Sequence, residues 1–193
     1  MKVLMLPLLL LFSCGNSEKS CTDKIGAEDW KGALKECSKA LEIKPKSADA
    51  FYNRGMAKQN LGDPKGAMLD YNSALDVDSK YAMAYVRRSS VKEHLGDSRG
   101  AISDCSRAIE INPNLSTAYN NRGLYKMRFG DIQGAMSDFN KAIDIDPNSA
   151  ASYINRGTLK QDLGDMEGAC LDWSKAGELG ESFAYEIINN FCN

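Results

Sequence analysis

Apolar residues recur at helical spacing in two successive runs, and this pair of runs is repeated along most of the chain. In one clear copy the runs cover residues 118–129 and 133–145, and the second has apolar residues at i, i+3, i+4 and i+7. Between them, Gly130 suits a left-handed helix end and Asp131 suits the N-cap of the next helix. Pro147 ends the second run. Each copy is therefore predicted to form a helix pair.

The copies follow one another at a fixed step of 34 residues. The Asn-Arg-Gly triplet at residues 121–123 has counterparts at 53–55, 87–89 and 155–157, and Gly-Ala recurs at 32–33, 66–67, 100–101, 134–135 and 168–169. One helix pair leaves an apolar face uncovered, whereas stacked pairs cover it. We therefore expect an all-α fold, an α-solenoid of antiparallel helix pairs with four full repeats plus atypical N- and C-terminal caps.

The recurring residues resemble those of the tetratricopeptide repeat (TPR) family. That family has an aromatic, a small residue, Ala, an aromatic, Ala and Pro at set positions of its repeat. At these positions, in the same order, the third repeat has Tyr119, Gly123, Ala135, Phe139, Ala142 and Pro147. The second repeat departs most, with Ser89 in place of Gly and Cys105 in place of the aromatic. The resemblance covers about residues 28–181. It implies a TPR superhelix whose leading helices line a groove for peptides or partner helices.

The period also divides the chain into segments. We expect a signal peptide at 1–13, a polar tether at 14–19, an N-terminal partial repeat or cap at 20–47, full repeats at 48–81, 82–115, 116–149 and 150–183, and a C-terminal capping helix at 184–193.

The N-terminal segment has a lysine, Lys2, followed by an apolar run over residues 3–12. This run is too short to span a bilayer as a mature helix and is typical of an export signal. The ending Ser13-Cys14 resembles a bacterial lipoprotein signal, although Phe12 is larger than usual, and the resemblance implies lipid on Cys14. We expect an exported cell-envelope protein, an outer-membrane lipoprotein facing the periplasm or the surface. The alternative is a soluble periplasmic or secreted protein.

Six cysteines in an exported chain suggest disulfide bonds. Cys170 and Cys192 lie symmetrically about Glu181, next to the turn predicted at Gly180, so a bond between them would join the last helix to the array. Cys21 and Cys37 are a second candidate pair. Apart from Cys14, the alternative is that the cysteines are buried thiols, as expected for Cys105.

Charge and motif content indicate no catalytic chemistry. The net charge is −2 without a Lys/Arg-rich run, so no nucleic-acid partner is expected. His94 is the only histidine, and no Cys/His cluster has zinc-site spacing. We expect no enzyme activity, no cofactor and no metal. Three aspartates precede a basic residue by three positions and are expected to form exposed pairs: Asp104 with Arg107, Asp138 with Lys141, and Asp172 with Lys175.

The resemblance places the candidate binding residues on the leading helices. They are Tyr52, Asn53, Met56, Val86, Arg87, Asn120, Asn121, Leu124, Met127, Ile154 and Asn155. The asparagines could bind a peptide backbone through both donor and acceptor. Alternatively, Asn-Arg-Gly supports the scaffold, with Arg stabilising the packing between repeats. The residues with which some family members bind a chaperone's C-terminal carboxylate are absent.

These observations favour a non-enzymatic scaffold or adaptor, anchored in the envelope through lipid on Cys14, that binds a protein or peptide in its groove. One alternative is an accessory subunit or ligand-binding lipoprotein of an envelope enzyme or cell-wall assembly system. Another is a secreted periplasmic repeat protein without lipid.

Overall fold

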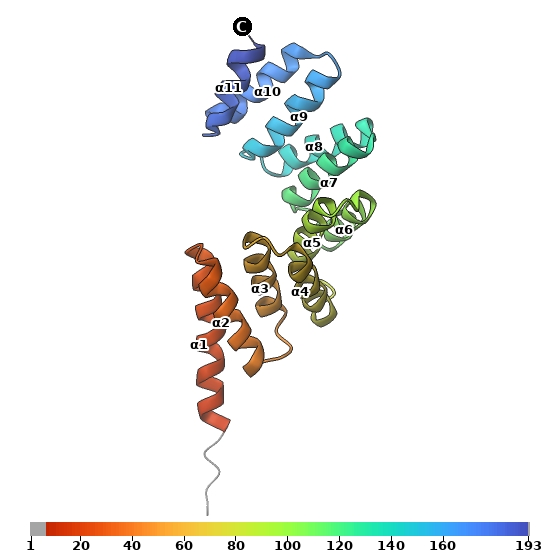
Figure 1. Cartoon of the computed structure of the whole chain (residues 1–193). Helices are drawn as coiled ribbons and strands as arrows, with labels where there is room; N and C mark the ends of the chain where they lie inside the picture. The colour runs from red at the N-terminus through yellow and green to blue at the C-terminus, as the bar shows by residue number, and fades with distance from the viewer. Residues whose placement is uncertain (1–6, 193) are drawn as a thin grey trace, which may run out of the picture. The chain divides into compact units, whose positions relative to one another are not determined.

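The computed structural model describes the backbone of residues 7–192 and the side chains of residues 17–192. This part of the chain forms eleven helices and no strand (Figure 1). The all-α, helix-pair solenoid predicted from the period is confirmed. The helices are α1 (Pro7–Gly26), α2 (Trp30–Ile43), α3 (Ala48–Asn60), α4 (Pro64–Val77), α5 (Ala82–His94), α6 (Ser98–Ile111), α7 (Ser116–Phe129), α8 (Ile132–Ile145), α9 (Ala150–Asp162), α10 (Met166–Glu178) and α11 (Ser182–Phe191).

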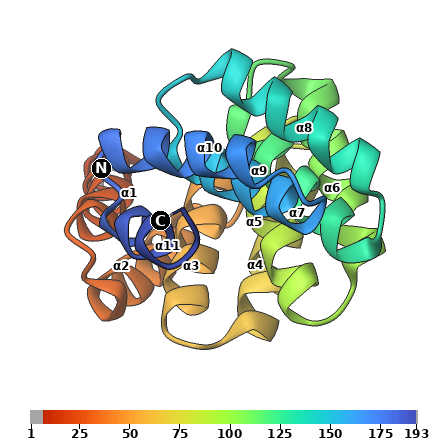
Figure 2. The same ribbon diagram turned by 90° about the horizontal axis from the view of Figure 1, so that it is seen from above.

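The helices form two compact units, α1–α5 and α6–α11. Consecutive helices within each unit lie side by side (Figure 2). The leading helices, which come first in each pair, also contact one another: α3 contacts both α1 and α5 in the first unit, and α7 contacts α9 in the second. Among the described helices, none has the length and apolar character needed to cross a membrane.

The segments outside the full repeats lie at the two ends of the chain, in α1 and α11. α1 is a continuous helix that includes residues 14–19, which the sequence suggested as a tether. The first part of the predicted signal peptide and the side chain of Cys14 lie outside the described residues, so both assignments stay predictions. At the other end, α11 packs on α10, with Ala184 fully buried and Phe191 6.0 Å from the Trp173 ring, centroid to centroid.

The turn inside each repeat follows from glycine and aspartate. Gly130 has φ +92°, a conformation that costs glycine little because it has no Cβ. The Asp131 carboxylate then accepts from the backbone N–H of Gly134, which satisfies one of the free donors of the next helix. The same cap recurs on α2, α4, α6 and α10. The predicted helix end and N-cap are confirmed at these positions.

A small residue opposite a ring sets the distance between the two helices of a repeat. A Cβ on Gly123 would lie only 2.8 Å from the Phe139 ring, so glycine lets the helices approach closely. Phe139 is fully buried with Ala135 and Leu159. In the partial repeat, Cys21 and Cys37 occupy the positions equivalent to Gly123 and Phe139, and their Sγ atoms lie at bonding distance, 2.06 Å apart. This sulfur pair stands in place of the glycine–ring contact there.

A buried ion pair joins the two helices of the third repeat. Arg122 donates through Nε and Nη2 to the two oxygens of Asp138, at 2.9 and 2.7 Å. Lys126 lies 2.8 Å from the same carboxylate, and Asp138 is only 4% exposed. Such a bidentate pair with an additional cation offsets the desolvation of the buried carboxylate. The arrangement recurs as Arg54–Asp70–Lys58 and Arg156–Asp172–Lys160.

The expected exposed pairs of the three aspartates are therefore wrong. Asp138 and Asp172 are buried and pair with the preceding helix, while Lys175 pairs instead with Glu178 and Arg107 with Glu110. Asp104 is likewise buried. Spacing along one helix suggested surface pairs, but Asp138 and Asp172 each bind an arginine that lies sixteen residues earlier in the chain.

The same arginines connect neighbouring repeats. Nη1 of Arg122 donates to Ser106 at 3.1 Å, and Nη1 of Arg156 donates to Asn140 at 2.8 Å; both acceptors belong to the preceding repeat. Arg88 contacts Asn72 in the same way. The guanidinium of Arg122 also lies 5.5 Å from the centre of the Tyr119 ring. This bears out the scaffold interpretation of the arginine in the Asn-Arg-Gly triplet.

We predict that Asp138→Asn lowers the free energy of unfolding by about 3–5 kcal/mol, because it leaves two buried cations without their carboxylate. Urea denaturation followed by circular dichroism would measure the loss. Asp162→Asn, at an exposed site without such partners, is the control and should change stability little. Equal effects of the two changes would contradict the assignment.

The Sγ atoms of Cys21 and Cys37 lie at bonding distance between α1 and α2, as do those of Cys170 and Cys192 between α10 and α11, with Cα–Cα distances of 4.8 and 5.8 Å. We predict that changing Cys21 and Cys37 to Ser reduces the protection of α1 amides against hydrogen exchange, while α11 stays protected. A loop of this length contributes about 3 kcal/mol on the chain-entropy model. The double Ser variant of Cys170 and Cys192 is the reciprocal control, expected to affect α11 and not α1. Unchanged α1 exchange in the first variant would show that the bond does not stabilise α1.

Candidate binding face of the leading helices

The predicted groove residues fall into two sets. Tyr52, Asn53 and Met56 lie on α3 and Val86 and Arg87 on α5, all in the first unit. The second unit carries the others on α7 and α9: Asn120, Asn121, Leu124, Met127, Ile154 and Asn155. Each set lies on leading helices that contact one another.

Tyr52 is the aromatic residue of the first set and packs against two other tyrosines. The Tyr52 ring stacks on Tyr81 with 5.0 Å between ring centres and lies 6.1 Å from Tyr71. Met56 packs against the buried Tyr71. Val86 is buried, so its side chain contributes to packing and not to the exposed face.

Arg87 has an incompletely satisfied guanidinium. Its Nε is buried and has no hydrogen-bond acceptor within the described residues. Burial raises the pKa of the nearby Tyr71, and the positive charge of Arg87 opposes that shift. The hydroxyl of Tyr71 donates to Gln59 at 2.8 Å, so the tyrosine is held neutral by burial and by this bond.

The second set combines amides with apolar side chains. Asn155 donates to Asn120 at 2.9 Å, which joins α9 to α7. Leu124 and Met127 are partly exposed and pack against the cluster around Phe139. The Asn121 amide is also partly exposed and makes no hydrogen bond in the described part of the chain. Both of its hydrogen-bonding groups are therefore available to a ligand.

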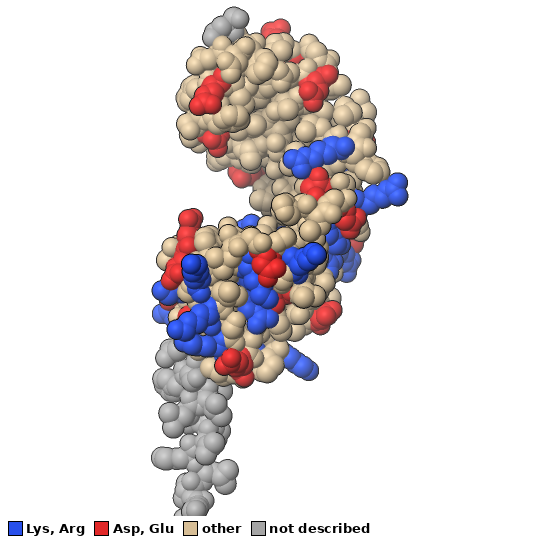
Figure 3. Space-filling model, viewed as in Figure 1, with Lys and Arg blue, Asp and Glu red and all other residues tan. Residues whose placement is uncertain are grey.

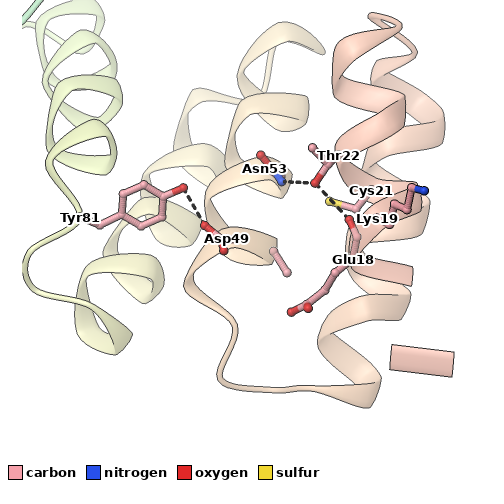
Figure 4. Close-up of a pocket in the computed structure, with 8 residues that line it drawn as sticks. Glu18, Lys19, Cys21, Thr22, Asp49, Asn53 and Tyr81 are labelled. Carbon is pink, nitrogen blue, oxygen red and sulfur yellow. Dashed lines mark hydrogen bonds between the residues drawn. The ribbon is translucent and has the colours of Figure 1, made fainter. Parts of the chain in front are cut away.

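A cavity of about 400 Å³ lies among α1, α3 and the residue before α5 (Figure 4). Such a volume falls within the range of small-ligand pockets. Its lining residues are Glu18, Lys19, Cys21 and Thr22 from α1, Asp49, Ala50 and Asn53 from α3, and Tyr81. Of these, only Asn53 was predicted as a groove residue.

Separate hydrogen bonds lie on two sides of this cavity. Tyr81 donates its hydroxyl to Oδ1 of Asp49 at 2.9 Å, and burial followed by this bond raises the pKa of Tyr81 (Figure 4). On the opposite side, Asn53 donates to Thr22 at 3.4 Å. Glu18 lies 3.2 Å from Lys44, and a hydrogen bond from Ser47 lowers the pKa of Glu18. Both carboxyl side chains of the cavity are thus close to donors of this chain.

Sequence reasoning missed the α1 side of the cavity because the partial repeat lacks the Asn-Arg-Gly triplet. The 34-residue step would have found it. Counting back from Tyr52, Asn53 and Met56 gives Glu18, Lys19 and Thr22. We call these repeat positions the lining positions; they hold Glu18, Tyr52, Val86, Asn120 and Ile154, then Lys19, Asn53, Arg87, Asn121 and Asn155, then Thr22, Met56, Ser90, Leu124 and Thr158.

The side chains of the described residues form no group of three or more His, Cys, Asp or Glu that could bind a metal ion. On the visible face of the first unit, Lys and Arg side chains lie among Asp and Glu side chains (Figure 3). His94 lines a separate cavity of about 300 Å³ with Gln59, Ser90 and Val91 and is exposed.

The tetratricopeptide repeat family model matches residues 48–81, 82–115 and 116–149, together more than half of the 193 residues. The chain belongs to the tetratricopeptide repeat family. The three matched ranges have the same limits as the first three repeats delimited by the period. No curated protein matches the sequence.

Solved structures with this fold are similar over most of the chain. MamA is 25% identical, with a TM-score of 0.70 over 86% of this chain and 96% of its own. YrrB, described as a TPR protein with an unusual peptide-binding site, is 22% identical, with a TM-score of 0.67 over 88% of each chain. PilW, described as a widely conserved type IV pilus biogenesis factor, is 16% identical, with a TM-score of 0.79 over 86% of this chain and 77% of its own.

Proposed function

We propose that this protein is a non-enzymatic scaffold that binds a peptide or a partner helix on the lining positions of its leading helices. The observation that carries the proposal is the contrast between two kinds of position. The Arg–Asp pair and the glycine–ring contact recur in the first, third and fourth full repeats and stabilise the fold. The lining positions vary more: the first of them holds five different residue types, although Asn recurs at the second, and most of them are partly exposed.

The side chains at these positions suit protein recognition. Asn121 has an amide without an internal partner, and Leu124 and Met127 offer partly exposed apolar surface beside it. An amide can bind a peptide backbone through donor and acceptor together, and methionine adapts its shape to an apolar side chain. A peptide-binding site in YrrB, which shares the fold, supports the same use of this fold here.

We further infer that the protein is exported and anchored to the cell envelope by lipid on Cys14. Two cysteine pairs at bonding distance favour an oxidising compartment, where such bonds persist. Similarity to a type IV pilus biogenesis factor supports an envelope location. Two or three acyl chains would give stable anchoring, at about 0.8 kcal/mol per buried methylene.

A ligand-binding lipoprotein, accessory to an envelope enzyme or a cell-wall assembly system, is the second candidate. It requires an aromatic or charged cluster on the leading helices. The stacked rings of Tyr52 and Tyr81, beside Asp49, provide such a cluster. The third candidate is a secreted periplasmic protein without lipid. It would have the same binding face and would differ only in that Cys14 carries no lipid.

We predict that Asn121→Arg reduces crosslinking of the protein to its partner in cells by at least fivefold, because a longer charged side chain covers the apolar surface next to it. Quantitative mass spectrometry after crosslinking would measure the loss. Gln133→Arg, an exposed change on the second helix of the same repeat, is the matched control. Undiminished capture by Asn121→Arg would place the partner elsewhere.

We predict that Cys14→Ser abolishes metabolic labelling with an alkyne-bearing fatty acid and releases the protein from the membrane fraction. Cys105→Ala, which removes a cysteine buried inside a repeat, should keep the label. In-gel fluorescence after click chemistry gives the readout. Label that persists in Cys14→Ser would rule out this anchor.

A further inference from the structure

We propose that the cavity among α1, α3 and Tyr81 binds a basic side chain, Lys or Arg, of a peptide segment in the partner. This assignment rests on the proposed scaffold function and specifies the chemistry of what the scaffold binds. Three properties of the cavity carry it: its hydrogen-bonding capacity, its charge and its aromatic wall.

The hydroxyl and amide donors of the cavity are engaged, whereas acceptors remain. Tyr81 donates to Asp49, Thr22 donates to the Glu18 carbonyl at 3.1 Å, and Asn53 donates to Thr22. In contrast, Oδ2 of Asp49 and Oδ1 of Asn53 accept no hydrogen bond from the described residues. These two oxygens can accept from a ligand that supplies several donors, as an ammonium or guanidinium group does.

Charge and aromatic surface favour the same class of ligand. Asp49 and Glu18 place carboxylates on two sides of the cavity. Glu18 is paired with Lys44 at 3.2 Å, so the negative charge available to a ligand is mainly that of Asp49. The Tyr81 ring, supported by its stack on Tyr52, gives a face over which a cation is stabilised. Lys19 is exposed at the edge of the cavity, so it can turn toward water when a cationic side chain enters.

Asn53 extends the contact from the side chain to the backbone of the bound peptide. Its Oδ1 can accept from a peptide N–H next to the basic residue, while its amide nitrogen stays on Thr22. A peptide is thus distinguished from a free cation such as a polyamine, which has no backbone amide to donate.

The test uses isotope-labelled protein titrated with N-acetyl-arginine N-methylamide and followed by NMR. We expect saturable shifts of the backbone amides of Thr22, Asp49, Asn53 and Tyr81. N-acetyl-glutamate N-methylamide and N-acetyl-norleucine N-methylamide should give none. Asp49→Asn, which keeps an acceptor for Tyr81, should weaken binding of the arginine probe about tenfold, since it removes a charge-assisted bond. Asp76→Asn, an exposed change on α4, is the matched control.

Two further variants make the outcome decisive. Lys19→Gln should strengthen binding of the arginine probe, and Asn53→Ala should weaken it without affecting n-butylguanidinium. Equal binding to wild type and Asp49→Asn would overturn the proposal. Binding of n-butylguanidinium as tight as that of the arginine probe would overturn the assignment to a peptide. Either result leaves the crosslinking test in the second unit intact, so failure here is separable from failure of the scaffold function.

Discussion

The first, third and fourth full repeats depend on one interaction. In each, a buried aspartate binds an arginine on the preceding helix. Asp138 would be strongly destabilising by itself, but Arg122 and Lys126 satisfy both of its oxygens. The arginine also bonds to the preceding repeat, so one side chain stabilises a helix pair and its junction with a neighbour. Because these roles need a rigid planar donor, lysine could not replace arginine there.

Stabilising residues and lining residues occupy different positions of the repeat, which explains why the binding face can vary without loss of the fold. Stabilising contacts lie between the two helices of a repeat, whereas the lining positions lie on the leading helices. Glu18, Tyr52 and Asn120 share one repeat position, yet they are an acid, an aromatic and an amide. Each repeat can thus present different chemistry on the same backbone, which is how a repeat protein acquires specificity for one partner.

Much of the fold was predictable because the helix signals are local. Gly130 and Asp131 indicate a helix end and the N-cap of the next helix within two residues of sequence. The 34-residue step predicts the limits of the repeats. The partners of Asp138 were mispredicted because ion pairs between helices join residues that are distant in the chain, and helical spacing alone favours the wrong basic residue. The cavity beside α1 was missed for a related reason. Its residues follow the period, but the triplet that marks a leading helix is absent, with Ser20 at the arginine position.

The N-terminal partial repeat packs its two helices with different chemistry. Ser20 and Glu36 stand where the full repeats have arginine and aspartate, and the sulfur pair of Cys21 and Cys37 occupies the place of the glycine and the ring. Cys21 also lines the cavity. Reduction of this sulfur pair would leave one wall of the cavity without a fixed separation from α2, whereas the third repeat sets its helix spacing with a glycine and a ring that no reductant changes.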